Sequence, residues 1–477
     1  MVGVGAARQP DRRPAGAGPL GPRRGTHAHP RTAAVLDPRG RCPMSEPSRD
    51  PEASRRTPRR FLFVVPPLVG HVNPTLGIAA ELTARGHQVA WAGMPEVVER
   101  LTGPGTTVHR CAGPVLGEGG AGRPPDVRGP AALKFLWERF LVPLAEAMAP
   151  GVTRAIAEFR PDVVIADQQT VAGALVAERL GVCWATSATT SAEFTGALDG
   201  MPKIDAWLDG LLHEVRGRIG DPEGTADPRF SPDLVLAFTT EELAGRPARA
   251  GDRIHYVGPS IAERPAGTDF PWEWLDPTRP AVLITLGTAN TDAGARFLTE
   301  CLEAVRARAG RLQSVIVDPD DVLAPDTPHD NDILVRRYVP QLPLLRRVNA
   351  VVCHAGHNTV CETLWHGVPL VVAPIRDDQP VVAAQVVDAG AGIRVRFGRA
   401  RAAAIGEALD AVLAEPRYRA AAERVGASFR AAGGATAAAT HLERLATAGA
   451  ATHASAVVPH ATASAATHPT ANPEGER

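Results

Sequence analysis

Residues 352–385 read VCHAGHNTVCETLWHGVPLVVAPIRDDQPVVAAQ, and this stretch carries most of the information about the fold. An apolar run ends at His354, and a helical pattern starts close to Asn358. A second apolar run, 369–373, is followed by two acids and another helical pattern. Short apolar strands that alternate with helices are typical of a parallel sheet covered on both faces. The stretch therefore predicts part of a doubly wound α/β domain.

The same alternation extends in both directions along the 477 residues. Before residue 258 it predicts strands at 61–66, 88–92, 162–166, 182–186 and 234–238, and helices at 74–85, 131–159 (broken at Pro143 and Pro150) and 170–180. After residue 280 it predicts strands at 282–286, 313–317, 333–335, 350–353, 369–373 and 393–396, and helices at 293–309, 342–348, 358–366, 379–389 and onward to about 446.

This order predicts an α/β protein with two doubly wound, Rossmann-like domains in succession. The first is expected at 59–257 and the second at 281–446, joined by the Pro- and Gly-rich segment 258–280. Segments 1–58 and 447–477 are low in complexity and lack a hydrophobic period, so we expect them to be disordered.

Composition excludes several classes of protein. Hydrophobic residues make up 44% and charged residues 22%, as in soluble globular proteins. Thirteen Arg and five acids give residues 1–60 a charge of +8, which leaves −9 on the remainder, so no nucleic-acid surface is expected. No apolar run is long enough to predict a membrane span. The six Cys lack CxxC spacing, which fits the cytoplasm.

The turn at residues 354–359 has features of a phosphate site. Gly356 allows a tight turn after the strand, and the amides of His357, Asn358 and Thr359 would begin the next helix. Amides at a helix N-terminus lack partners within the helix and favour an anion such as a diphosphate. An ordinary capped turn, with Asn358 or Thr359 as the cap, explains the same residues equally well.

Further polar residues are expected at the same edge of the second sheet. Glu362 lies one helical turn after Asn358, where a carboxylate can accept hydrogen bonds from ribose hydroxyls. Asp378 and Gln379 follow the next strand, and their side chains suit the hydroxyls of a sugar. A solvated helix start, where acids are favoured, is the simpler explanation of Asp377 and Asp378.

Taken in this order, these motifs resemble the nucleotide-sugar signature of family-1 glycosyltransferases (the UDP-glycosyltransferase superfamily), most closely the bacterial macrolide and natural-product type. The resemblance covers roughly residues 60–446. It implies the GT-B fold, a UDP- or dTDP-sugar donor, inversion at the anomeric carbon without a metal, and no cofactor. It implies a role in antibiotic or other natural-product biosynthesis, with a small-molecule acceptor and a monomer or homodimer as the assembly.

The resemblance also assigns donor-binding roles. It places Tyr338, Val339 and Gln341 at the base, and His354 with the amides after Gly356 at the diphosphate. It places Glu362 at the ribose, Asp378 with Gln379 at the hexose, and Gly287 with Thr288 at a further phosphate or sugar contact. The family often has Trp where Tyr338 stands, and because Tyr can also stack on a base, both uridine and thymidine donors stay open. The family also often has Trp where His357 stands, a difference that bears on which sugar is held.

Transfer to a hydroxyl also needs a base, because an alcohol is a poor nucleophile at neutral pH. In GHVNP, residues 70–74, His71 follows the first apolar strand, with Asn73 and Pro74 suited to cap and begin a helix. Asp167 ends another strand and can orient the imidazole if the parallel sheet brings the two together. The family resemblance matches both positions. A turn or capping role is the alternative for each residue.

Three rival interpretations remain. The string DPDD at 318–321 is similar to the Asp-x-Asp metal motif of glycosyltransferases with a single nucleotide-binding fold. A sugar-nucleotide epimerase would use the same scaffold, and a non-catalytic relative would bind nucleotide sugars without needing His71. NAD chemistry lacks support, since neither GxGxxG after the first strand nor a Walker A string occurs.

Overall fold

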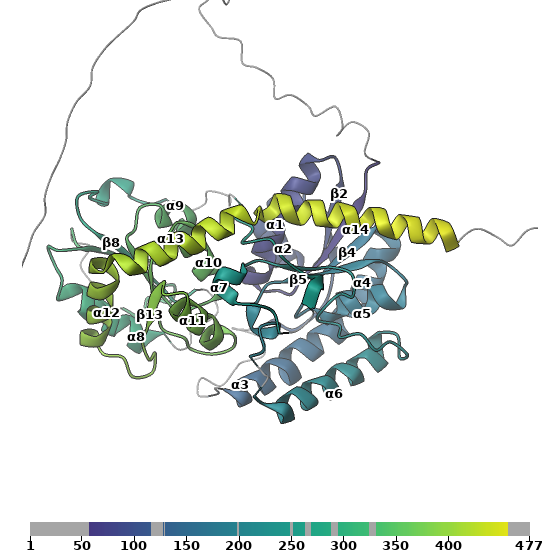
Figure 1. Ribbon diagram of the computed structural model, residues 1–477, viewed down its shortest axis with the longest axis horizontal. Coiled ribbons are helices and arrows are strands. Elements are labelled where there is room, and N and C mark those ends of the chain that lie inside the picture. The colour runs from purple at the N-terminus through teal and green to yellow at the C-terminus, as the bar shows by residue number, and fades with distance from the viewer. Residues whose placement is uncertain are drawn as a thin grey trace, which may run out of the picture. The chain divides into compact units, whose positions relative to one another are not determined.

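Two parallel β-sheets organise the chain in this computed structural model (Figure 1). The residues that the structure describes are 57–115, 127, 129–197, 200–248, 251–262, 269–287, 294–323 and 331–456. The predicted N-terminal segment lies almost entirely outside this part of the chain, and so does most of the predicted tail.

The first sheet has the strand order β3-β2-β1-β4-β5-β6-β7 within the described residues. Its strands are β1 (Arg60–Val64), β2 (Gln88–Gly93), β3 (Val108–Arg110), β4 (Val163–Asp167), β5 (Trp184–Ala188), β6 (Val235–Ala237) and β7 (Ile254–Tyr256). All neighbours are parallel, and Phe61 of β1 lies opposite both Val89 and Val163. The order reverses between β1 and β4, and ligands of open α/β sheets bind outside the carboxyl ends of the strands at such a point.

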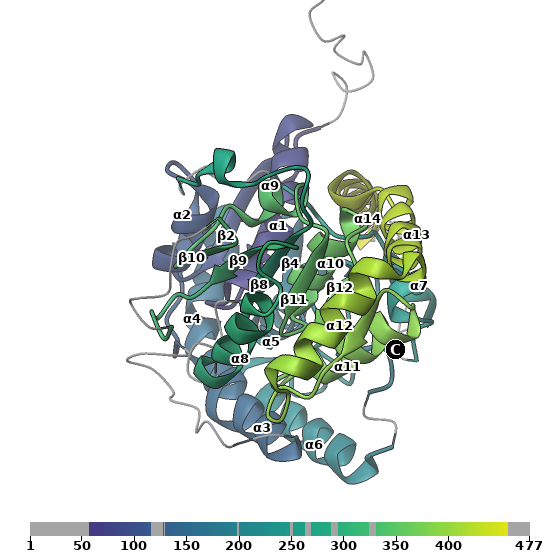
Figure 2. The ribbon, with the colours of Figure 1, turned by 90° about the vertical axis from the view of Figure 1, so that its left-hand side faces the viewer.

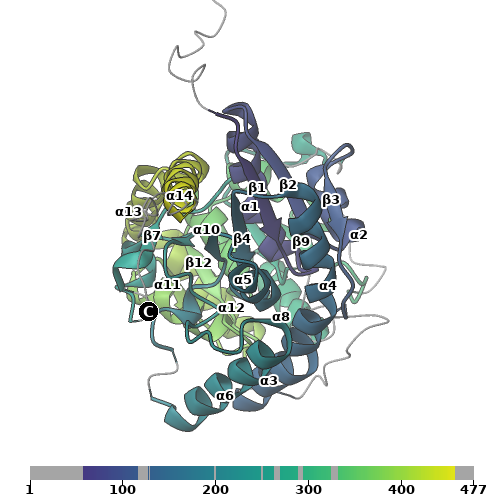
Figure 3. The same ribbon diagram turned by 90° about the vertical axis from the view of Figure 1, so that its right-hand side faces the viewer.

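Helices cover both faces of the first sheet (Figure 3). They are α1 (Val69–Ala84), α2 (Pro95–Thr102), α3 (Pro130–Phe135), α4 (Val142–Phe159), α5 (Val171–Arg179) and α6 (Pro202–Ile219). The short α7 (Glu241–Ala244) instead buries Leu243 in the apolar core of the second half of the chain. One face packs against α4, α5 and α6, and the other against α1 and α2. Burial on both faces explains why β1 after Arg60 and β4 before Asp167 are entirely apolar.

The second sheet has the order β10-β9-β8-β11-β12-β13. Its strands are β8 (Ala281–Thr285), β9 (Gln313–Val317), β10 (Ile333–Arg336), β11 (Ala350–Cys353), β12 (Leu370–Val372) and β13 (Gly392–Arg394). The helices of this half are α8 (Ala295–Arg306), α9 (Gln341–Leu345), α10 (His357–Trp365), α11 (Gln379–Asp388), α12 (Ala402–Ala414), α13 (Pro416–Ala431) and α14 (Gly434–Ala456). Helices α8 and α12 cover the face turned toward the viewer in Figure 2. Here the switch point lies between β8 and β11.

The last helix returns to the first half of the chain. Helix α14 lies along α1 (Figure 1). Its Ala438, Ala439 and Leu442 are buried in the same apolar cluster as Phe61 and Ile78. Polar contacts reinforce this packing, since Glu443 of α14 accepts a hydrogen bond from Arg85 and lies 2.8 Å from Nε2 of His87. Residues distant in sequence thus share one core, while the exact domain boundaries stay a prediction.

Two local predictions are wrong. Helix α1 begins at Val69 rather than Pro74, so His71 lies in its first turn and Pro74 inside it. Asn73 does not cap the helix, and its Oδ1 has no hydrogen-bond partner in the described structure. Because proline has no N–H, the carbonyl of Gly70 receives no helical hydrogen bond from residue 74. The helix is held at this end by Leu68, whose carbonyl accepts the amides of His71 and Val72.

The predicted breaks at Pro143 and Pro150 are also wrong. Helical structure runs without interruption from Pro130 to Phe159, with a π-helical stretch at Leu136–Leu141. Pro143 follows Val142, whose amide bonds to the carbonyl of Trp137 five residues earlier, so it stands where the regular ladder of helical hydrogen bonds is already interrupted. The segment is long and apolar enough to cross a membrane, but most of it is buried inside the protein, as in core helices, so it is weak evidence for a span.

Candidate active site

His71 and Asp167 meet at the switch point of the first sheet. Asp167 is the last residue of β4, and His71 follows β1 in the first turn of α1. Nδ1 of His71 lies 3.0 Å from each carboxylate oxygen of Asp167. Asp167 is only 1% exposed, whereas the imidazole keeps 17% of its surface accessible. The two residues that the sequence singled out are therefore within hydrogen-bonding distance.

The surroundings of His71 favour its protonated form. Burial acts to lower the pKa of His71, whereas the charge and hydrogen bond of Asp167 act to raise it. The carboxyl groups of Asp378 and Glu193 add to this effect, so the pKa lies above its ordinary value. An imidazole held in this way can accept a proton and remain stable as an imidazolium.

Sequence reasoning missed two further partners of this pair. Thr189, which follows β5, lies 2.8 Å from Nδ1 of His71 and donates a 2.7 Å hydrogen bond to Asp167 Oδ2. The amide of Gln169 donates to Asp167 Oδ1 at 2.9 Å. Thr189 carries the same signal as Asp167, since both stand at the carboxyl end of a parallel strand. Only the strand order shows that β5 lies beside β4.

His354 occupies the switch point of the second sheet. Its ring is packed between two glycines, because a Cβ on Gly356 would lie 2.3 Å from the ring and one on Gly287 would lie 2.7 Å from it. Gly287 has a φ of +69°, a conformation that also favours glycine. Burial lowers the pKa of His354 to about 4, so the ring is neutral near pH 7. Its Nδ1 has no hydrogen-bond partner among the described residues.

Helix α10 starts directly after this histidine. The first residue is His357, and Gly356 precedes it without a side-chain cap, so neither Asn358 nor Thr359 is the cap. The first amide that bonds back to the turn is that of Val360, to the carbonyl of Gly356. The three preceding amides therefore lie at an uncapped helix N-terminus, one of the two arrangements that the sequence left open.

The side chains of His357 and Asn358 turn to the first half of the chain. Nε2 of His357 lies 3.3 Å from the carbonyl of Phe238, and burial lowers the pKa of His357 to about 4. Asn358 donates a 2.6 Å hydrogen bond from Nδ2 to the carbonyl of Gly70. That carbonyl is the one that Pro74 leaves without a helical partner. Helix α10 and helix α1, which contains His71, are thus hydrogen-bonded directly to each other.

Two of the predicted base and ribose residues lie together. Gln341, the first residue of α9, donates a 2.7 Å hydrogen bond to Oε2 of Glu362, which is 4% exposed. Tyr338 stands before them on the loop after β10 with 61% of its surface exposed, whereas Val339 packs against the core. Thr359 is buried, and its carbonyl accepts the hydroxyl of Thr363.

Of the residues predicted to bind the sugar, Asp378 also contacts the first half of the chain. Asp378 Oδ2 accepts a 2.9 Å hydrogen bond from the hydroxyl of Thr190, the neighbour of Thr189. Burial and the charge of Asp377 raise the pKa of Asp378 to about 6. Oε1 of Gln379 accepts the amides of Ile375 and Arg376 and so shapes the turn before α11. Thr288 lies outside the described residues.

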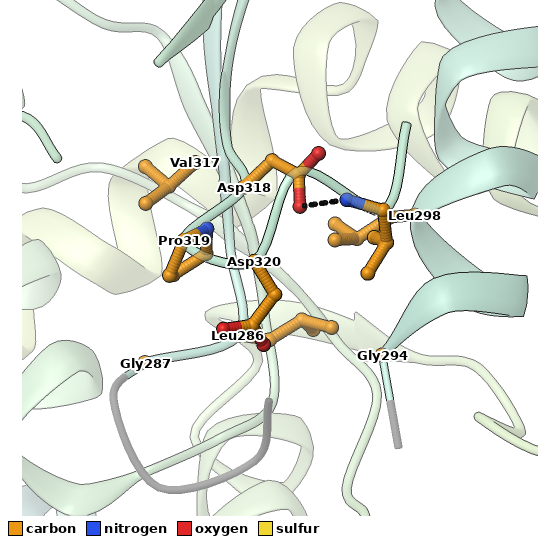
Figure 4. A pocket seen from close by; sticks show the side chains of 9 residues that line it. Leu286, Gly287, Gly294, Leu298, Val317, Asp318, Pro319 and Asp320 are labelled. Carbon is orange, nitrogen blue, oxygen red and sulfur yellow. Dashed lines mark hydrogen bonds between the residues drawn. The ribbon is translucent and has the colours of Figure 1, made fainter. Parts of the chain in front are cut away.

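The string DPDD forms a turn in which the carboxylate of Asp318 already accepts backbone hydrogen bonds, one of which is drawn in Figure 4. Its two carboxylate oxygens accept the amides of Val322 and Leu323, and the side chain is buried. Asp321 forms an ion pair with Arg337. Among the residues described, no cluster of three or more His, Cys, Asp or Glu is placed to hold a metal ion. These contacts give the string a structural role.

Comparison with known proteins identifies the family of this chain. The family model of UDP-glucoronosyl and UDP-glucosyl transferases matches residues 285–428. The 4'-demethylrebeccamycin synthase of Lentzea aerocolonigenes is 31% identical over 405 residues, which cover 77% of this chain and 94% of the relative. The demethyllactenocin mycarosyltransferase of Streptomyces fradiae is 28% identical over 441 residues, covering 86% and 93%. The crystal structure of the glycotransferase of kitacinnamycin superposes with a TM-score of 0.65, at 24% identity, over 81% of this chain and 99% of the other.

The two Rossmann-like sheets and the superposition with this solved structure define the GT-B fold, and the family model and the two relatives define a glycosyltransferase. Enzymes of this class use nucleotide sugars as donors. The chain belongs to the UDP-glucoronosyl and UDP-glucosyl transferase family, that is, the family-1 glycosyltransferases. The predicted fold class and family are both confirmed.

Proposed function

We propose that this enzyme transfers a hexose from a UDP- or dTDP-sugar to a hydroxyl of a small lipophilic acceptor, with inversion and without a metal. The observation that carries the proposal is the His71–Asp167 pair, with Nδ1 of the imidazole 3.0 Å from both carboxylate oxygens. Epimerisation of a bound sugar nucleotide and simple binding give no role to a base on the acceptor side.

His71 acts as the general base. Its Nδ1 is engaged by Asp167, so Nε2 is the nitrogen that takes the proton of the acceptor hydroxyl. The acceptor oxygen forms the new bond to the anomeric carbon, while the bond from that carbon to the diphosphate oxygen breaks. The electron pair leaves with the diphosphate. Attack from the side opposite the leaving group inverts the anomeric centre, and Asp167 stabilises the imidazolium that results.

The second half of the chain stabilises the leaving group. The uncapped N-terminus of α10 presents the amides of His357, Asn358 and Thr359 together with the positive end of the helix dipole. The unpartnered ring nitrogen of His354 adds a donor from a neutral imidazole. Such donors stabilise the developing charge at no cost of reorganisation.

The remaining donor contacts follow the order of the motif along the sheet edge. Tyr338 stacks on the base beside Val339 and Gln341, and Glu362 binds the ribose. Asp378 and Gln379 bind hydroxyls of the hexose, and Gly287 with Thr288 adds a contact on the phosphate or sugar side. The exposure of Tyr338 supports stacking, because a large aromatic ring in water gains from covering by a planar base.

The acceptor belongs, we propose, to natural-product chemistry. The two relatives named above are a 4'-demethylrebeccamycin synthase and a demethyllactenocin mycarosyltransferase. A polyketide, macrolide or phenolic hydroxyl is therefore the acceptor we expect, which fits a role in antibiotic biosynthesis.

The test is His71→Ala, with product formation followed by mass spectrometry over a panel of UDP- and dTDP-sugars and acceptors. We expect kcat to fall by about 100-fold or more, because a general base contributes roughly 10²- to 10⁴-fold. Donor affinity should remain close to that of the wild type. The matched control is His109→Ala, which removes a histidine paired with Glu158 outside the site. Equal loss of transfer and of donor affinity would mean that His71 is structural, and loss of wild-type activity in EDTA would revive a metal mechanism.

A further inference from the structure

Thr189 contacts His71, the proposed general base, although the packing of its own strand does not require this contact. It follows β5, is 4% exposed, and directs its hydroxyl at both His71 and Asp167. The hydroxyl lies 2.7 Å from Asp167 Oδ2 and 2.8 Å from His71 Nδ1. A threonine that served only to fill space would not need both contacts.

The protons of this triangle can be counted. A hydroxyl carries one proton, and an ionised carboxylate carries none, so the 2.7 Å contact uses the proton of Thr189. The 2.8 Å contact to His71 must then use a proton on Nδ1, with Thr189 as the acceptor. Asp167 requires the same proton, 3.0 Å away. Both neighbours therefore demand the Nδ1–H tautomer, which leaves Nε2 unprotonated in the neutral ring.

We propose that Thr189 is a positioning residue for this base, acting through His71 and Asp167 rather than on the substrate. The proposal rests on the proposed function, in which His71 takes the proton of the acceptor. Thr189 fixes Asp167 Oδ2, and the amide of Gln169 fixes Oδ1, so the carboxylate cannot rotate about its soft terminal torsion. The branched side chain of Thr189 is itself stiff at its first torsion.

The next residue serves the other half of the site. Thr190 donates a 2.9 Å hydrogen bond from its hydroxyl to Asp378. Of two adjacent threonines, Thr189 therefore contacts the proposed base and its carboxylate, and Thr190 contacts a residue proposed to bind the sugar. This arrangement separates their expected effects. Loss of the Thr189 hydroxyl should lower kcat, whereas loss of the Thr190 hydroxyl should act on the affinity for the donor.

The experiment compares Thr189→Val, Thr189→Ser and Thr190→Val in the full chain. For Thr189→Val we expect a kcat about tenfold lower, the effect of one hydrogen bond of ordinary strength, with an unchanged KM for the donor. Thr189→Ser keeps the hydroxyl and should recover most of the rate. Thr239→Val is the matched control, because it removes a buried hydroxyl that has no partner in the described structure.

A second measurement does not depend on turnover. With ¹⁵N-labelled histidine, the Nδ1–H proton of His71 should give a downfield resonance protected from exchange in the wild type and in Thr189→Ser. In Thr189→Val the same resonance should exchange faster. Wild-type kcat together with an unchanged resonance in Thr189→Val would overturn the proposal. If His71→Ala alone retained full activity, the proposed function would fail instead, while the resonance would still test the contact with Thr189.

Discussion

Replacement of Asp167 by Asn tests the electrostatic role of the pair with almost no change in shape. Three donors converge on this carboxylate: Nδ1 of His71, the hydroxyl of Thr189 and the amide of Gln169. An asparagine offers one oxygen and an NH₂ group, so at least one of these donors would face another donor. The variant also removes the negative charge that stabilises the imidazolium.

The size of the effect follows from the contact that is lost. A hydrogen bond to a charged group contributes about 1.5–3 kcal/mol, and about 1.4 kcal/mol corresponds to a tenfold change in rate. We therefore expect kcat to fall roughly 10- to 150-fold. Asp162→Asn is the matched control. Asp162 lies directly before β4, at the end opposite to Asp167, and pairs there with Arg59.

The pH profile provides the decisive readout. The base works unprotonated, so kcat/KM of the wild type falls as the pH drops through the pKa of His71. Asp167 raises that pKa, whereas burial lowers it. Without the carboxylate, the acid limb of the profile must therefore move to lower pH even though the plateau drops. An Asn variant with wild-type kcat, or with an acid limb that stays in place, would refute the reasoning.

Two further predictions concern the donor side. His354→Ala should weaken the binding of UDP or dTDP roughly 10- to 150-fold in titration calorimetry, since one hydrogen bond to a charged diphosphate is lost, and unchanged affinity would contradict the phosphate assignment. Asp378, with a pKa raised to about 6, should lose its charge as the pH falls through that value, so the KM for the donor should rise below pH 6 in the wild type. In Asp378→Asn the KM should be insensitive to pH over this interval, and a pH dependence that persists would assign it to another group.

The strands that carry the site were predictable because each is a short apolar run bounded by turns. β4 was expected at 162–166 and lies at Val163–Asp167, and β11 was expected where it occurs. Other elements gave no such signal. β3 and β7 are short edge strands. Helix α14 was expected to end near residue 446, because the sequence beyond it is low in complexity, but it continues to Ala456.

The site was predictable to the extent that its residues follow strand ends. His71, Asp167 and His354 each stand at the carboxyl edge of a sheet, so chain order and the parallel rule placed them. Thr189 obeys the same rule, but its value depends on β5 lying next to β4, which sequence alone does not give. The start of α1 was misplaced because Pro74 is favoured at the first position of a helix, whereas here Leu68 caps the turn with its carbonyl.

The bond from Asn358 to the carbonyl of Gly70 has a consequence for hybrid enzymes. Pro74 leaves that carbonyl without a helical partner in one half of the chain, and Asn358 supplies the donor from the other, so the two residues form a matched pair between the halves. A chimera that joins this first half to the second half of a relative must preserve a donor of the same reach at position 358. Otherwise a carbonyl directly before the proposed base loses its partner, and the exchange disturbs a half of the protein that was never altered.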